Sequence, residues 1–237
     1  FLWGIGCCVY CFGCDFEGVV MARNVFISFR YSDGYEYKDE LAALFNESDD
    51  TVDFSEDEDR SQMSDDSIQK FLYGKLKRSS VTIILLTPKA IKYNTTIQHV
   101  PYSYQYNTVF DDWIYDEVRY SLEDREGNAT NALVAVYVPE AEQYLFQRRT
   151  HKCFVCNKES EVLSILDCNN LFRVNMMNVK PDYKVNKCPG IYDSDWDSYC
   201  SLVAYDDFKK DFAKYIDNAY KKRGELYKYN LVKRLQP

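Results

Sequence analysis

The sequence predicts an α/β domain built on a doubly wound parallel sheet. Two segments, 81–86 and 132–138, are apolar at nearly every position, which is typical of strands that are buried on both faces. Predicted strands and helices alternate in the order β-α-β-α-β-loop-α-β, and this order favours a parallel sheet covered by helices. The prediction adds a long loop before a helix that begins at Trp113, and a cysteine-containing C-terminal elaboration.

The first half of the chain alternates short strands with amphipathic helices. β-Branched and aromatic residues over 24–29 predict the first strand, and a turn is expected at 32–34. The following helix has its apolar residues on one face: Tyr37, Leu41, Leu44 and Phe45. A short second strand is expected at 51–54. After an acidic loop, Ser64 would cap a helix whose apolar face is formed by Ile68, Phe71, Leu72 and Leu76.

The second half contains the long loop and the remaining elements of the sheet. Residues 87–112 are rich in Tyr, Asn and Thr, and a loop of this length is usually functional or disordered. Asp112 would cap the next helix, in which Ile114, Val118 and Leu122 form the stripe that faces the core. A last long helix is expected at about 206–222, with Phe208, Phe212, Tyr215, Ile216 and Ala219 on one face.

Charge and cysteine usage narrow the class of protein. The formal net charge is −8, and an acidic chain without a basic stripe is a poor partner for nucleic acid or an anionic membrane. Residues 1–20 contain four cysteines but neither a basic n-region nor a cleavage site, so we interpret them as upstream sequence before Met21, with a genuine N-terminal extension as the alternative. Five further cysteines in the last third and no export signal favour the reducing cytoplasm.

We expect residues 21–150 to form the main domain and residues 151–237 to form a C-terminal elaboration that completes it. In an open parallel sheet, ligands bind outside the carboxyl ends of the strands. The candidate binding residues at that edge are Phe29, Arg30, Asp33, Asp53 and Trp113. At 100° per residue, Glu117 lies between Trp113 and Tyr120 on the helix surface, beside the core stripe. The alternative for Glu117 is an ordinary surface carboxylate, and for Arg30 a surface salt bridge.

Three strings in the expected order carry a resemblance to a known family. RNVFISFRYSD (23–33) is similar to the first strand and turn of TIR-like domains, and SSVTIILLTP (79–88) is similar to their third strand. WIYDEVRYSL (113–122) resembles the tryptophan-x-x-x-glutamate helix of TIR enzymes that cleave NAD⁺. The resemblance covers roughly 22–140, implies a TIR/flavodoxin-like fold, and is greatest to the TIR-like subunit of bacterial Thoeris anti-phage systems. The long loop before Trp113 and the cysteine-rich region after 140 depart from the family pattern.

The resemblance implies an enzyme that consumes NAD⁺, with Glu117 as its catalytic residue. Breaking the nicotinamide–ribose bond develops oxocarbenium character, which a nearby carboxylate stabilises. Trp113 would stack on a ring, Arg30 would pair with the pyrophosphate, and Phe29 and Asp33 would shape the ribose and adenine side. Water would give ADP-ribose, whereas an internal nucleophile in a dry site would give a cyclic isomer, with the Tyr-rich segment 92–107 as a candidate lid.

The implied partners are NAD⁺, a separate effector that senses the product, a phage-derived trigger and further copies of the chain. Two alternatives stay open: a non-catalytic TIR-like adaptor that acts by self-association, and a flavodoxin-like nucleotide-binding module. The sequence contains neither a Walker phosphate loop nor G-x-G-x-x-G. NAD⁺ is therefore expected as a consumed substrate rather than as a bound redox cofactor, and no cofactor is expected for catalysis.

The cysteines of the last third suggest a structural zinc site. The segment from His151 to Cys156 resembles half of a zinc knuckle, because a C-x-x-C turn delivers two of the four ligands that tetrahedral zinc requires. The predicted ligands are Cys153, Cys156, Cys188 and Cys200. Buried free thiols and a redox pair remain the alternatives.

Overall fold

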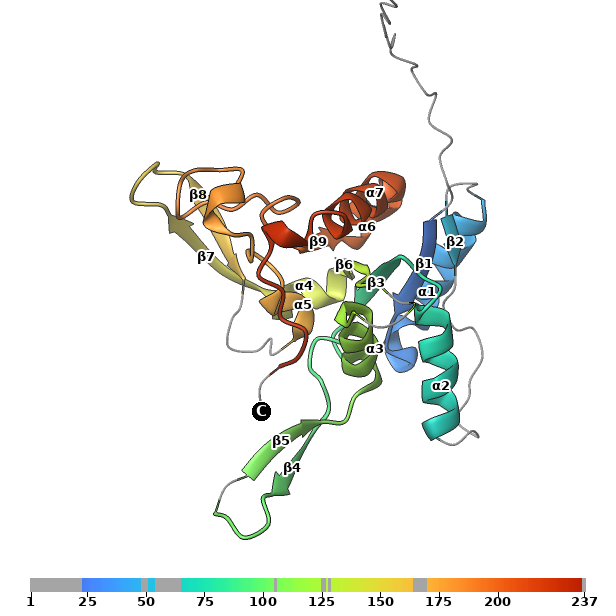
Figure 1. The fold of residues 1–237 in the computed structure, drawn as a ribbon. Coiled ribbons are helices and arrows are strands. Elements are labelled where there is room, and N and C mark those ends of the chain that lie inside the picture. Colours follow the sequence, from blue (N-terminus) through green and yellow to red (C-terminus); the bar gives the residue numbers. More distant parts are fainter. Residues whose placement is uncertain are drawn as a thin grey trace, which may run out of the picture.

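A central parallel sheet organises the molecule in a computed structural model of the chain, which describes residues 23–47, 51–53, 65–104, 106–124, 127, 129–163 and 170–235 (Figure 1). Within these ranges, five strands pair in parallel in the spatial order β2-β1-β3-β6-β9. Their bounds are Arg23–Ser28 (β1), Thr51–Asp53 (β2), Val81–Leu86 (β3), Ala132–Tyr137 (β6) and Cys200–Ala204 (β9). This order is the doubly wound arrangement that the sequence predicts, and it reverses direction at β1 and β3.

Helices cover both faces of the sheet. Figure 1 shows α2 and α3 on one side and α6 and α7 on the other. The ring of Phe45 in α1 contacts Phe208 of α6 and Phe212 of α7, so α1 packs with these two helices. The longer helices are α1 (Tyr31–Asn46), α2 (Asp65–Leu76), α3 (Trp113–Leu122), α6 (Tyr205–Lys210) and α7 (Phe212–Arg223). The shorter ones are α4 (Glu142–Leu145), α5 (Leu171–Val174), η1 (Pro139–Ala141), η2 (Pro181–Tyr183) and η3 (Leu226–Lys228).

The core follows the predicted apolar pattern. Every residue of β3 is buried, and β6 is buried except at Tyr137. In α3, the predicted stripe of Ile114, Val118 and Leu122 is fully inside. Burying such side chains contributes roughly 1.5–3 kcal/mol each, so this stripe firmly fixes the face that α3 turns to the sheet. No helix in the described part of the chain is both long enough and apolar enough to cross a membrane.

Three local expectations were wrong. The segment 87–112 is not an irregular loop, because it contains the antiparallel hairpin of β4 (Thr95–His99) and β5 (Tyr106–Phe110), which projects away from the sheet (Figure 1). The turn expected at 32–34 is the first turn of α1, which begins at Tyr31. The predicted long C-terminal helix divides into α6 and α7, because Asp211 leaves helical geometry at φ −149° and ψ 49°.

A second hairpin lies in the C-terminal part of the chain. It consists of β7 (Phe146–Lys152) and β8 (Glu159–Leu163), with Cys153 and Cys156 in its turn. The segment after α5 then leads through η2 to β9, the fifth strand of the parallel sheet. The leader 1–20 and Ser64 lie outside the described residues.

Candidate functional site

The carboxylate of Glu117 is buried where the strand order reverses. Glu117 lies one turn into α3, and its side chain turns toward the carboxyl end of β1 rather than outward. Ser28, the last residue of β1, donates its hydroxyl to Glu117 Oε2 over 2.5 Å. Glu117 is 8% exposed and Ser28 is 0% exposed, so bulk water does not solvate this pair. The carboxyl is therefore not the surface group that was the alternative interpretation.

Burial raises the pKa of Glu117 to about 8, because the charged form loses its hydration. The hydrogen bond from Ser28 opposes this shift, and the negative charge of Asp112 adds to it. A carboxyl group with a pKa near the operating pH can exchange a proton or carry a charge as the reaction requires. Side chains with strongly shifted pKa values are often found at functional sites. In parallel sheets, ligands bind at the switch point, where Glu117 lies.

Arg30 and Asp112 form a buried ion pair beside Glu117. Arg30 Nη2 donates to Asp112 Oδ2 over 2.5 Å, and the Asp112 side chain is fully buried. Asp112 also accepts from the backbone N–H groups of Ile114 and Asn94, so it caps α3 as predicted. The segment after β1 is thus bonded through Arg30 to the N-cap residue of α3, and this bond holds Glu117 near Ser28.

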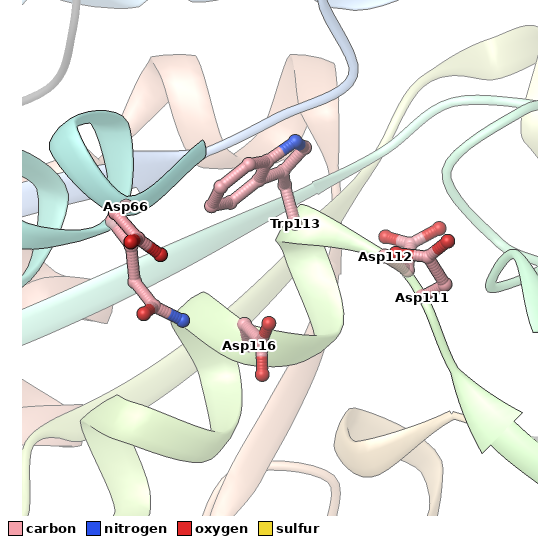
Figure 2. Close-up of a pocket in the computed structure, with 6 residues that line it drawn as sticks. Asp66, Asp111, Asp112, Trp113 and Asp116 are labelled. Carbon is pink, nitrogen blue, oxygen red and sulfur yellow. The ribbon is translucent and has the colours of Figure 1, made fainter. Parts of the chain in front are cut away.

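A cavity of about 220 Å³ opens between α2 and the N-terminus of α3. Its lining is strongly acidic apart from one aromatic and one amide side chain, and consists of Asp66, Gln69, Asp111, Asp112, Trp113 and Asp116. Figure 2 shows Trp113 and Asp116 on the side of α3 that faces α2, with Asp66 approaching from α2. Trp113 is 37% exposed, so its ring is accessible. The acidic lining disfavours anions and favours a cationic group.

Residues 26–109 match the family model described as Thoeris protein ThsB, TIR-like domain. The chain therefore carries a TIR-like domain similar to those of Thoeris proteins. The match begins inside β1 and ends in β5, so it includes Phe29, Arg30, Asp33 and Asp53. It stops before α3, and the assignment of Glu117 therefore depends on the geometry around Ser28 and on the similarity of the 113–122 string.

The other predicted binding residues of the TIR-like domain lie around the same edge. Asp33 stands in the first turn of α1, and its Oδ2 accepts from the backbone N–H of Lys89, just after β3. Its Oδ1 is buried and has no partner within the described ranges. Phe29 is half-buried against the core, and Asp53 ends β2 next to β1. The structure brings Arg30 close to Glu117, and the backbone N–H of Asp33 donates to the carbonyl of Arg30 over 3.3 Å.

The roles of two residues in the site were not predicted from the sequence, and one residue was misplaced. Ser28 received no role because it ends an apolar strand, although a hydroxyl at the carboxyl end of β1 was a usable signal. Asp112 was recognised only as a cap, whereas it also holds Arg30. Tyr120, expected beside Glu117, instead stacks on Tyr73 of α2 at 3.8 Å in a satellite core cluster.

The predicted zinc ligands divide into a cluster of three and one outlier. The sulfur atoms of Cys153, Cys156 and Cys188 lie within 4.8 Å of one another. Hydrogen bonds from the backbone amides of Cys156 and Val155 lower the pKa of Cys153 to about 7. Cys200 does not join them, because it lies inside β9 opposite Leu133, and burial raises the pKa of its thiol to about 12. Cys200 is therefore not a ligand of this cluster, and the predicted set of four zinc ligands was wrong at this residue.

Proposed function

We propose that this TIR-like domain cleaves NAD⁺ at the nicotinamide–ribose bond and produces a signalling nucleotide in cytoplasmic anti-phage defence. The similarity to the Thoeris protein supports the defence role and the class of enzyme. One observation of the site carries the chemistry: Glu117 is a buried carboxyl group, bonded to Ser28, at the switch point of the parallel sheet. A surface adaptor has no need of such a group, since burying it costs free energy.

The carboxylate of Glu117 would act on the ribose. As the bond to nicotinamide breaks, positive charge develops on the ribose ring, and a carboxylate nearby stabilises it. This attraction is stronger in a site from which water is excluded. Glu117 would also accept a hydrogen bond from a ribose hydroxyl, and the hydrogen bond from Ser28 would hold the carboxylate in place.

The cavity beside Trp113 would receive the nicotinamide end of the substrate. At about 220 Å³ it is smaller than the roughly 300–1,000 Å³ typical of whole ligands, so it suits a fragment rather than the dinucleotide. Its carboxylates attract the cationic nicotinamide ring and repel phosphates. The pyrophosphate would therefore lie toward Arg30, whose guanidinium keeps N–H donors besides the one bonded to Asp112. Phe29, Asp33 and Asp53 would bind the ribose and adenine side.

A specific observation also favours self-association. The β4–β5 hairpin carries exposed Ile97, Tyr102, Tyr104 and Tyr106. Exposed apolar groups of this kind mark contact surfaces. The hairpin projects away from the sheet, and this position does not support the lid expected of 92–107 (Figure 1). Assembly through this hairpin would serve an enzyme that is active as an oligomer, or the non-catalytic adaptor that is the alternative function.

Incubating the full chain with NAD⁺ tests the proposal. We expect the release of nicotinamide together with an equal amount of ADP-ribose or of its cyclic isomer. Mass spectrometry distinguishes these two products and so identifies the nucleotide that an effector would sense. A second incubation with lysate from phage-infected cells supplies a trigger. If a folded protein releases no nicotinamide under either condition, the adaptor function is favoured instead.

A further inference from the structure

Two separate turns bring three cysteine sulfurs together, far along the chain from Glu117. Cys153 and Cys156 lie in the turn between β7 and β8, and Cys188 lies in the segment between η2 and β9. Cys188 Sγ is 3.2 Å from Cys153 Sγ and 3.3 Å from Cys156 Sγ. A disulfide would use two of these sulfurs and leave the third without a partner, whereas one metal ion would use all three.

The first turn has the backbone expected of a C-x-x-C metal loop. The N–H of Cys153 donates to the carbonyl of Lys158, and the N–H of Asn157 donates to the carbonyl of Cys153. Asn157 adopts a left-handed conformation with φ 58°, which bends the chain back after Cys156. The turn therefore presents Cys153 and Cys156 on the same side, as paired metal ligands require.

The second turn approaches the first very closely. A Cβ atom at Gly190 would lie 2.8 Å from Cys153 Sγ, so only glycine fits at this position. The ammonium of Lys184 donates to the carbonyls of Cys188 and Pro189. Lys184 is 9% exposed, and its positive charge at the backbone of the Cys188 turn would partly offset the negative charge of a tris-thiolate metal complex.

Little apolar burial holds the second turn in place. Tyr183, Val185 and Tyr192 are exposed, and the described polar support comes largely from Asp197, which accepts from the backbone N–H groups of Val185 and Asp193. Small regions without a core of their own are commonly stabilised by a structural metal. The cluster joins the β7–β8 hairpin to the segment that leads into β9.

We propose that Cys153, Cys156 and Cys188 bind a Zn²⁺ ion through three thiolates, with a solvent-derived ligand in the fourth position. Thiolates are soft ligands that select zinc among the available divalent ions, and tetrahedral zinc tolerates one water ligand. The ion acts as a structural crosslink between the two turns. Cys200 has no part in it, because its sulfur lies in the core of the sheet.

Metal analysis of the full chain tests this site independently of NAD⁺ cleavage. Protein purified under reducing conditions without chelator is expected to contain about one zinc ion per chain, and metal-free protein should bind Co²⁺ with thiolate-to-metal charge-transfer absorption. Cys156→Ser is the first variant, because Cys156 is at the surface and its side chain is not part of the core. It should lose the zinc and weaken the cobalt band. Cys200→Ala, which removes a thiol outside the cluster, should keep both.

Two results would overturn the proposal. Folded wild-type protein that binds neither Zn²⁺ nor Co²⁺ excludes the site. A disulfide between Cys153 and Cys188 in the protein as purified, found by thiol titration and peptide mass, would assign these sulfurs to redox chemistry instead.

Glycine substitutions provide a further prediction at the same site. Gly190→Ala should weaken zinc affinity by about 10-fold or more, because the new methyl group displaces Cys153 Sγ from its position. Gly74→Ala is the matched control, since a Cβ on this exposed position of α2 meets no described atom within 4 Å. It should leave zinc affinity unchanged and raise the denaturant midpoint, because alanine favours the helical conformation of α2 more than glycine does. Competition with a metal indicator and chemical denaturation measure the two effects, and equal zinc affinity in both variants would contradict the close approach.

Discussion

Glu117→Gln is expected to lower the rate of nicotinamide release by about 10³-fold while leaving the protein folded. Glutamine keeps the size of the side chain and the hydrogen bond with Ser28, but it cannot carry the charge that stabilises the ribose cation. The matched control is Glu140→Gln, the same change at an exposed carboxylate that accepts from Tyr37. This control should retain wild-type activity. Activity of Glu117→Gln within a few-fold of wild type would remove Glu117 from the mechanism.

The buried carboxyl group of Glu117 should also make the stability of the fold depend on pH. The pKa of Glu117 is about 8 in the folded protein and roughly 4.3 in an unfolded chain, so the folded state holds the extra proton between these values. Glu117 therefore contributes stability that is fully present below the unfolded pKa and is lost as pH rises through about 8. The loss amounts to several kcal/mol at most, at about 1.4 kcal/mol per pKa unit. Glu117→Gln should flatten this dependence in urea denaturation between pH 6 and pH 9, and gain stability at the alkaline end.

The activity should rise over the pH range in which the stability falls. The carboxylate is the form that stabilises the cation, so kcat/KM for NAD⁺ should rise with pH up to about 8 in the free enzyme. A profile that is flat from pH 6 to pH 9 would mean that the ionisation of Glu117 does not limit turnover.

The strands of the parallel sheet are better predicted from the sequence than the hairpin and the C-terminal helices. A strand that is buried on both faces is apolar at nearly every position, and this pattern is easily recognised. The run at 81–86 matches β3 to the residue, and each of its side chains is buried. The β4 strand is exposed at every position, so it has no apolar face that could predict it. The break at Asp211 is also absent from the pattern, since Phe208 and Ile216 are buried on either side of it as one continuous helix would place them.

For the candidate site, the helical spacing of residues predicts the position of Glu117, but the spacing of the cysteines does not predict the position of Cys200. The wheel places Glu117 beside the core stripe of α3, and this is sufficient to predict its position at the ligand edge. Whether its carboxyl group faces solvent or β1 depends on the crossing of α3 over the sheet, which no local pattern encodes. Similarly, cysteine spacing cannot show that Cys200 lies in β9, because a cysteine can be a small buried apolar residue as well as a metal ligand.

Asp112→Ala is expected to destabilise the domain by about 3–5 kcal/mol, the usual effect of breaking a buried ion pair. The change removes the cap of α3 and the acceptor for the N–H of Asn94, and it leaves the Arg30 guanidinium without its partner in a site where its side chain is 19% exposed. Asp112→Asn should cost less, because an amide oxygen can still cap α3. Urea denaturation measures both variants.

The control for this pair is Asp116→Ala, one turn further along α3. Asp116 also bonds an arginine, Arg119, but its side chain is 28% exposed and the pair lies within the helix surface, so the cost should stay below about 1 kcal/mol. If Asp112→Ala costs no more than this, the Arg30–Asp112 pair does not hold α3 against β1. The distinction matters for the chemistry, because α3 carries both Trp113 and Glu117. A helix that is free to shift at Asp112 would break the hydrogen bond between Ser28 and Glu117, and with it the geometry on which the proposed NAD⁺ cleavage depends.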